Sequence, residues 1–251
     1  MADKPRTPDP PRKVQAPKVR TKQPTKGGGG LSMPSTNSLI GAGLVGLVAV
    51  ALVLILALSG TSSGGGDVSE GDVTKVRTAM TAAGCTLVSK RAAADQQHMS
   101  AADQAVRYAT FPPSSGIHNP TTSIWGNYRL PVDPRQAVHN LEHGAIAIWY
   151  GNDISTDDRE ALDGFYDEDE NGIIISPIQD PYPRVTYPKH EKLGSRIALT
   201  TWTVNSETGV GTVYIATCPS FDETAFAAFR DAFRGKGSER VPVSQMVPGG
   251  N

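Results

Sequence analysis

The chain has 251 residues and a formal net charge of -1, a length that allows one domain of ordinary size with additional segments. The charge is uneven, because residues 1–37 hold eight Lys or Arg against two Asp, a net of +6 that leaves -7 for the remainder. An acidic main part disfavours nucleic-acid binding, so we expect no nucleic-acid partner. The sequence also lacks a phosphate loop, a dinucleotide fingerprint and a G-x-S-x-G elbow, which argues against the enzyme classes that carry them.

The first quarter of the chain predicts a tail and a membrane anchor. Residues 1–37 are basic and rich in proline, a composition that cannot bury enough apolar surface to fold, so we expect a disordered tail. Leu39–Leu58 follows with twenty uncharged residues. As a helix this run spans about 30 Å, the thickness of bilayer hydrocarbon, and predicts a transmembrane helix within residues 38–59. A cleaved signal peptide is the alternative, with a small-residue site in Ala57-Leu58-Ser59-Gly60.

Positive charge stays on the cytoplasmic side of a membrane, which predicts a single-pass protein of the plasma membrane with its N-terminus inside. The lipid bilayer is then one partner, and the basic tail is expected to contact anionic headgroups. Residues 60–66 are rich in Gly and Ser and predict a flexible tether. The exoplasmic domain is therefore expected to comprise residues 67–251, and no protein partner follows from the sequence.

Both cysteines, Cys85 and Cys218, fall in this outer part. Disulfides persist outside the cytoplasm, so we predict a bridge between the two. It would close a loop of about 130 residues and contribute on the order of 4–5 kcal/mol in the chain-entropy model. Two free thiols, or a cysteine ligand in a metal site, are the alternatives.

Hydrophobic periodicity and turn residues predict the regular elements of the outer domain. The predicted helices are Asp72–Ala83, a short one starting at Ser155 or Thr156, and one opened by a capping box in Ser220-Phe221-Asp222-Glu223. The predicted strands are Ala145–Tyr150, Ile173–Ile175, Arg196–Val204 and Val210–Thr217. Without an alternating strand–helix register, the expected fold class is α+β, a mostly antiparallel sheet with flanking helices packed on one side.

Residues 108–135 form an aromatic and proline-rich segment without a clear period. A long irregular loop inside a compact domain is usually either functional or disordered. The density of aromatic residues favours a segment that packs against the domain, with His118 near its middle.

Four of the five histidines fall within 46 positions, and His139 and His143 are spaced to lie on one face of a helical turn. Imidazole is the commonest metal ligand. The pattern predicts a site for zinc or copper, with Glu142 as a ligand, a base or a support for an imidazole. The candidate metal ligands are His98, His118, His139, His143 and Glu142. His190 stands apart and is left out.

The string from His139 to His143 also fits the H-x-x-E-H pattern of inverted zinc peptidases, which need it inside a long helix. Here Gly144 and a β-rich run follow at once. We therefore favour a non-enzymatic metal-binding module over a zinc-dependent hydrolase with Glu142 as general base, and assign no catalytic residue. A structural or interaction domain with hydrogen-bonded histidines is the third hypothesis. Imidazoles more than about 6 Å apart would favour the third, and a closed four-ligand shell would favour the first.

Several motifs resemble one family, the domain-of-unknown-function family numbered 3105, which is common as single-pass membrane proteins in actinobacteria. The motifs are Tyr108, Pro112–His118, Trp125–Tyr128, Val138–Gly144 and Gly235–Glu239. The resemblance extends from about His98 through the helix after Cys218 to that last motif. It implies that the five candidate ligands are family motif positions, and it implies no activity. Ile117 and Ser238 depart from the family's usual residues, and neither is a candidate ligand.

Overall fold

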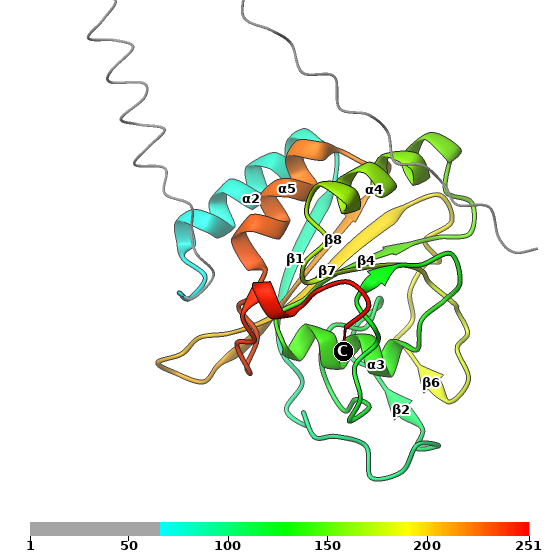
Figure 1. Ribbon diagram of the computed structural model, residues 1–251, viewed down its shortest axis with the longest axis vertical. Coiled ribbons are helices and arrows are strands. Elements are labelled where there is room, and N and C mark those ends of the chain that lie inside the picture. Colours follow the sequence, from blue (N-terminus) through cyan, green and yellow to red (C-terminus); the bar gives the residue numbers. More distant parts are fainter. Residues whose placement is uncertain (1–65, 251) are drawn as a thin grey trace, which may run out of the picture. The chain divides into compact units, whose positions relative to one another are not determined.

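A six-stranded sheet lies at the centre of the part of the chain that the computed structural model describes, residues 66–250 (Figure 1). The predicted tail, the predicted transmembrane helix and nearly all of the tether fall outside this range. Within residues 66–250, no helix is both long and apolar enough to cross a membrane. The fold is α+β, as predicted.

The regular elements alternate with long irregular connections. The helices are α2 (Glu70–Ala82), α3 (Pro134–Glu142), α4 (Thr156–Glu168), α5 (Glu223–Phe233) and the 3-10 turn η2 (Val243–Gln245). The strands of the main sheet are β1 (Thr86–Arg91), β3 (Gly126–Asn127), β4 (Ile146–Tyr150), β5 (Ile173–Pro177), β7 (Ile197–Val204) and β8 (Gly211–Cys218). A separate pair joins β2 (Val106–Arg107) to β6 (Val185–Thr186) in parallel.

The sheet is mixed, so the prediction of a mostly antiparallel sheet was wrong. Its strand order is β1-β8-β7-β4-β5-β3. The pairs β1/β8, β8/β7 and β7/β4 are antiparallel, whereas β4/β5 and β5/β3 are parallel. The cause is the helix α4 between β4 and β5, because parallel neighbours need a crossover connection of this kind. The prediction included all three elements but did not combine them into a strand–helix–strand unit.

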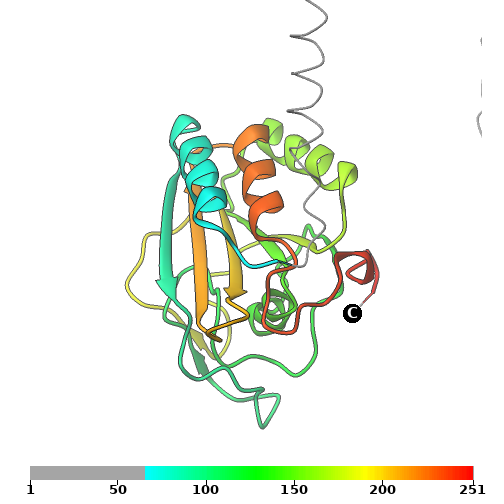
Figure 2. The ribbon, with the colours of Figure 1, turned by 90° about the vertical axis from the view of Figure 1, so that its left-hand side faces the viewer.

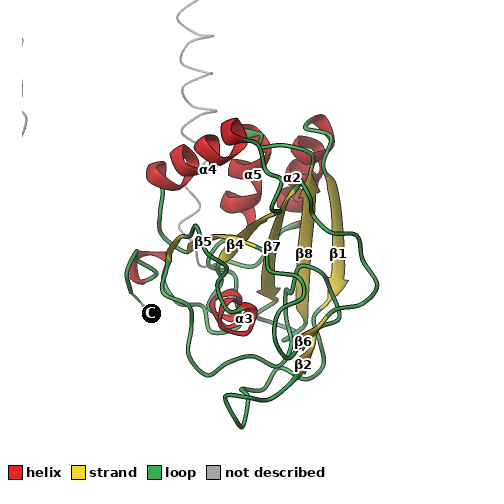
Figure 3. Cartoon of the chain, turned by 90° about the vertical axis from the view of Figure 1, so that its right-hand side faces the viewer, coloured by secondary structure: helices red, strands yellow, loops and turns green. Residues whose placement is uncertain are grey.

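Helices cover both faces of the sheet, which corrects the expectation of helices on one side. The helices α2, α4 and α5 pack on one face (Figure 2), and α3 lies apart from them against the other (Figure 3). Strand β4 shows why, since Ile146 and Ile148 face the three helices while Ala147 and Trp149 face the α3 side. A strand buried on both faces is apolar throughout instead of alternating.

Side-chain caps fix where the outer helices begin. Ser69 and Asp72 form a reciprocal capping box at the start of α2, and Ser155 caps α4. The cap of α5 is Asp222, whose side chain accepts a hydrogen bond from the Ala225 backbone N–H, and not the predicted Ser220 box. A carboxylate at this place both satisfies a free N–H and interacts favourably with the helix dipole.

Cys85 and Cys218 are joined by a disulfide, as the sequence predicted. Cys85 follows α2 directly and precedes β1, whereas Cys218 is the last residue of β8. The antiparallel register of β1 and β8, with Thr86 opposite Thr217, brings the two cysteines together. The bridge belongs to the apolar core beneath α2 and α5.

Candidate metal centre

His98 and His118 are neighbours because the two segments that carry them run side by side as a short parallel bridge. The Met99 N–H donates to the His118 carbonyl over 2.7 Å, and the His118 N–H donates to the Gln97 carbonyl over 3.3 Å. Their ring centroids lie 4.8 Å apart. Two irregular segments thus bring two imidazoles to one place.

Helix α3 delivers His139 and Glu142. Asp133 caps its N-terminus and Pro134 occupies its first turn, where a missing N–H costs nothing. Residues three apart lie on the same helix face, so His139 and Glu142 point in similar directions. The helix ends at Glu142, after which Gly144 adopts a φ of 100°, a conformation that suits glycine.

A buried amide holds the irregular segment against α3. The Asn140 side chain accepts from the Ser123 N–H over 2.8 Å and donates to the Ser123 carbonyl over 2.9 Å. His139 adds a second link, because its Nδ1 lies 2.8 Å from the Asn119 carbonyl. These contacts fix the distance between His118 and the ligands on the helix.

Four side chains converge in what we call the inner group: His98, His118, His139 and Glu142. Each offers one ligand atom, and all these atoms lie within 4.8 Å of one another. Ligand atoms around tetrahedral zinc are separated by roughly 3.3 Å, as follows from bonds of about 2.0–2.1 Å. The distances from Glu142 Oε2 to His118 Nε2 and His98 Nε2 are 2.9 Å and 3.8 Å, on either side of that value. Small side-chain movements would close the shell around an ion.

The hydrogen-bond geometry of His118 supports a cation at this point. Its Nδ1 lies 2.8 Å from the Gly116 carbonyl and must donate, so a neutral ring has its lone pair at Nε2. That lone pair faces the Glu142 carboxylate over 2.9 Å, and the His118 side chain is wholly buried. Two acceptors in contact need a proton or a metal ion between them. The donor set of three imidazoles and one carboxylate therefore fits a transition metal.

Burial and neighbouring charges shift the pKa values of His139 and Glu142, and the shift of Glu142 depends on protonated histidines beside it. Burial lowers the pKa of His139, and the nearby His143 and His118 lower it further against the opposing hydrogen bond to Asn119. Burial alone would raise the pKa of Glu142, but the hydrogen bond and charge of His118, together with His139 and His98, outweigh it and the pKa is lowered. Neutral imidazole and ionised carboxylate are the ligand forms.

His143, a predicted ligand, lies outside the inner group. It pairs with Glu239, whose Oε2 lies 2.8 Å from His143 Nε2. His139, His143 and Glu239 form a second cluster, the outer group, whose ligand atoms also lie within 4.8 Å of one another. Glu239 was missed as a site residue, although it closes the Gly235–Glu239 motif that carried the family resemblance. His190 lies elsewhere, hydrogen-bonded to Asp180 over 3.0 Å.

The geometry differs from that of inverted zinc peptidases. Helix α3 has only nine residues and ends at Glu142, so His143 caps the helix instead of lying within it. Glu142 also contacts His118 directly, which suits a ligand better than a base acting on water. Four protein donors could complete the coordination of one ion, whereas catalytic zinc keeps a position for water.

Comparison with known proteins places the chain in a family without assigning it an activity. No curated protein and no solved structure gave a match. The family model described as protein of unknown function DUF3105 matches residues 98–244, which is more than half of the chain and includes both ligand groups. The resemblance seen in the sequence motifs is thereby confirmed, and the chain belongs to the DUF3105 family.

Proposed function

We propose that this chain is a membrane-anchored exoplasmic protein that binds one transition-metal ion through the inner group. The observation that carries the proposal is the contact between the buried His118 Nε2 and the Glu142 carboxylate, with His98 and His139 beside it. The ring centroids of these histidines are 4.8–5.0 Å apart. A purely structural role would have been favoured by imidazoles more than about 6 Å apart.

The donors suit zinc and copper, the two metals predicted. Three nitrogens and one oxygen without sulfur exclude a thiolate site. Four converging donors favour tetrahedral zinc. The site is accessible for exchange, since the side chain of His98 is 47% exposed, whereas His118 anchors the ion from inside. Such a site supports metal handling, or assembly of an envelope metalloprotein, better than hydrolysis.

Three features support the proposal that the chain is anchored in the membrane with its folded domain on the outer side. Leu39–Leu58 is long and apolar enough for a membrane helix, and the basic residues before it favour a cytoplasmic N-terminus. The Cys85–Cys218 disulfide suits the oxidising side of the membrane.

Metal content of the purified full chain tests the proposal. We expect about one zinc or copper ion per chain after removal of loosely bound metal. Loss of a supporting residue costs 10–100-fold in affinity, so His98→Ala and Glu142→Gln, which remove ligands, should cost at least about 100-fold. His190→Ala is the matched control, because it removes a histidine outside both groups. Equal metal content in all four proteins, or none in the wild type, would contradict the proposal.

A further inference from the structure

The outer group of His139, His143 and Glu239 is a second set of metal donors next to the first. The rings of His139 and His143 lie 4.7 Å apart, and Glu239 reaches His143 from a segment beyond α5. The Glu239 side chain is 48% exposed and that of His143 is 19% exposed. The outer group therefore extends from the buried His139 to the surface.

Backbone contacts hold Glu239 in place. The Gly235 N–H donates to the Gly144 carbonyl over 2.8 Å, and the Glu239 N–H donates to the Glu142 carbonyl over 3.3 Å. Gly237 lies so close to α3 that a Cβ there would come within 2.1 Å of the Glu142 carbonyl oxygen. The end of α3 and the segment that carries Glu239 thus form one packed unit, which fixes the outer group relative to the inner one.

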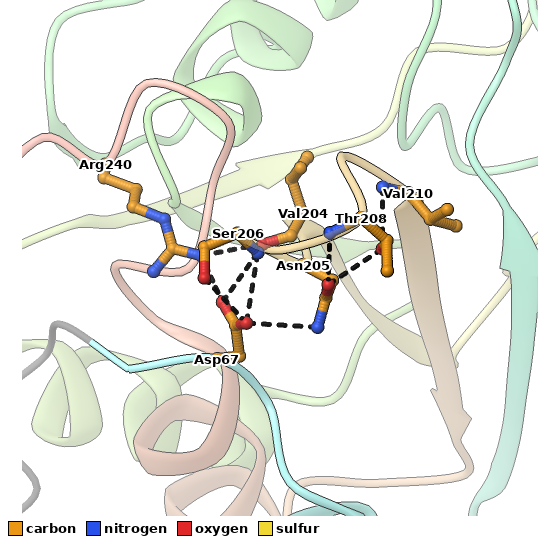
Figure 4. Close-up of polar contacts among 7 residues, drawn as sticks. All are labelled: Asp67, Val204, Asn205, Ser206, Thr208, Val210 and Arg240. Atoms are coloured by element: carbon orange, nitrogen blue, oxygen red, sulfur yellow. Dashed lines mark hydrogen bonds and ion pairs between the residues drawn. The ribbon is translucent and has the colours of Figure 1, made fainter.

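Arg240, the residue after Glu239, also makes specific contacts. Arg240 adopts a φ of 48°, which is unusual for a residue with a side chain, and its guanidinium binds the Asp67 carboxylate and the Val204 carbonyl. Figure 4 shows the Asp67 carboxylate as the shared partner of Arg240, Ser206 and Asn205. This network joins the start of the described domain to the β7–β8 hairpin and to the residue that follows Glu239.

His139 belongs to both groups but can serve only one ion at a time. Its Nδ1 donates to the Asn119 carbonyl, so the neutral ring has a single lone pair, at Nε2. An ion bound there draws its remaining ligands either from the inner group or from His143 and Glu239. The two sets are therefore alternative positions for one ion.

We propose that the outer group is an exchange position through which a divalent transition-metal ion enters and leaves the inner group. The inference rests on the proposed function, and it adds the route that the ion takes. Three protein donors leave one position of a tetrahedral ion open, and an incoming ligand from an acceptor can occupy it. His139 keeps its bond to the ion while the other ligands are replaced one by one.

The rates of zinc uptake and release by the full chain test the route. Release is followed by rapid mixing of the zinc-loaded protein with an excess of a chromogenic chelator, and uptake by mixing the metal-free protein with zinc. Loss of one ligand from the exchange position should slow both rates in Glu239→Gln by roughly tenfold or more. Their ratio, the equilibrium affinity, should change much less than either rate. His143→Asn should slow both rates to a similar extent. The double variant should be little slower than either single variant, because both changes interrupt the same step.

The control is Glu191→Gln, which removes an exposed carboxylate outside both groups and should leave both rates unchanged. Unchanged rates in Glu239→Gln would overturn the inference, because zinc would then exchange on the His98 side. Two zinc ions bound per wild-type chain would also overturn it, because the positions would not be alternatives. A wild type that binds neither zinc nor copper would instead contradict the proposed function itself.

Discussion

The two faces of the central sheet are built differently. The face under α2, α4 and α5 is a continuous apolar core that includes Phe226, Phe229 and Phe233. The face under α3 buries polar side chains, among them His118, His139 and Asn140. Buried polar groups cost free energy unless they are hydrogen-bonded, and each of these three side chains has a specific partner. Both faces bury an apolar cluster, and the α3 face in addition uses hydrogen-bonded polar side chains to position the candidate ligands.

The largest expected effect separates stability from metal binding. Phe229 is wholly buried and packs against Phe233 with ring centroids 4.8 Å apart. Phe229→Ala should lower the free energy of unfolding by about 3–5 kcal/mol, because it removes contacts and leaves a cavity. Zinc affinity of the protein that remains folded should stay unchanged, since the ligands lie across the sheet. Denaturant unfolding of the metal-free chain and zinc titration measure the two quantities.

Phe229→Leu is the matched control for that variant. It keeps most of the buried volume and should recover the greater part of the lost stability. A fall in zinc affinity of the folded Phe229→Ala protein would show instead that the two faces are coupled through the sheet.

A substitution on the α3 face should have an intermediate effect, on both the unfolding free energy and the zinc affinity. Asn140→Ala removes both hydrogen bonds to Ser123 and leaves buried backbone groups unpaired, a cost of about 1–3 kcal/mol in unfolding free energy. Zinc affinity should fall by roughly 10–100-fold, because the segment that carries His118 loses its alignment with α3. The exposed Asn152→Ala is the control. Lost stability with full zinc affinity would mean that Asn140 supports the fold without positioning the site.

Most helices and strands of the helical face, the one under α2, α4 and α5, could be predicted, because the patterns that specify them lie within short segments of the sequence. Periodic apolar residues identified α2, α4 and α5, an apolar run identified β4, and β-rich segments around a hairpin-like loop identified β7 and β8. Strand β1 was missed because it lies at the sheet edge and is mostly exposed, so its residues do not alternate. Strands β2, β3 and β6 have two residues each, too few for any period to show.

The candidate site could be predicted only where its residues are close in sequence. The spacing of His139 and His143 predicted a helical turn, and the structure has His139 and Glu142 on α3 with His143 as its C-cap. Nothing in the spacing separated His143 from the inner group, since that depends on where the helix ends and on its pairing with Glu239. Glu239 lies almost a hundred positions later, and tight packing of Gly144 against Gly235 and Gly237 brings it to the site. Contacts of this kind leave no periodic signal.

The smallest expected effect is a pH dependence confined to the helical face. Asp169 follows α4 and binds Arg234, which follows α5, through contacts of 2.8 Å and 2.6 Å. The hydrogen bonds from Arg234 lower the pKa of Asp169 below its ordinary 3.8, against the opposing effect of burial. A carboxyl whose pKa is lower in the folded than in the unfolded state adds stability above the unfolded value. That stability is lost as the pH falls through the folded pKa.

Asp169→Asn should therefore lower the unfolding free energy near pH 7 by at most about 1 kcal/mol, because the Asp169 side chain is 37% exposed and solvent screens the pair. The difference from wild type should stay constant down to about pH 5 and shrink at lower pH, where the wild-type carboxyl takes up a proton. Added salt should also reduce it. Denaturant unfolding of the metal-free proteins across this pH range measures the difference. Because Asp169 lies on the helical face, the variant should bind zinc like the wild type at pH 7, and weaker binding would contradict the division between the faces.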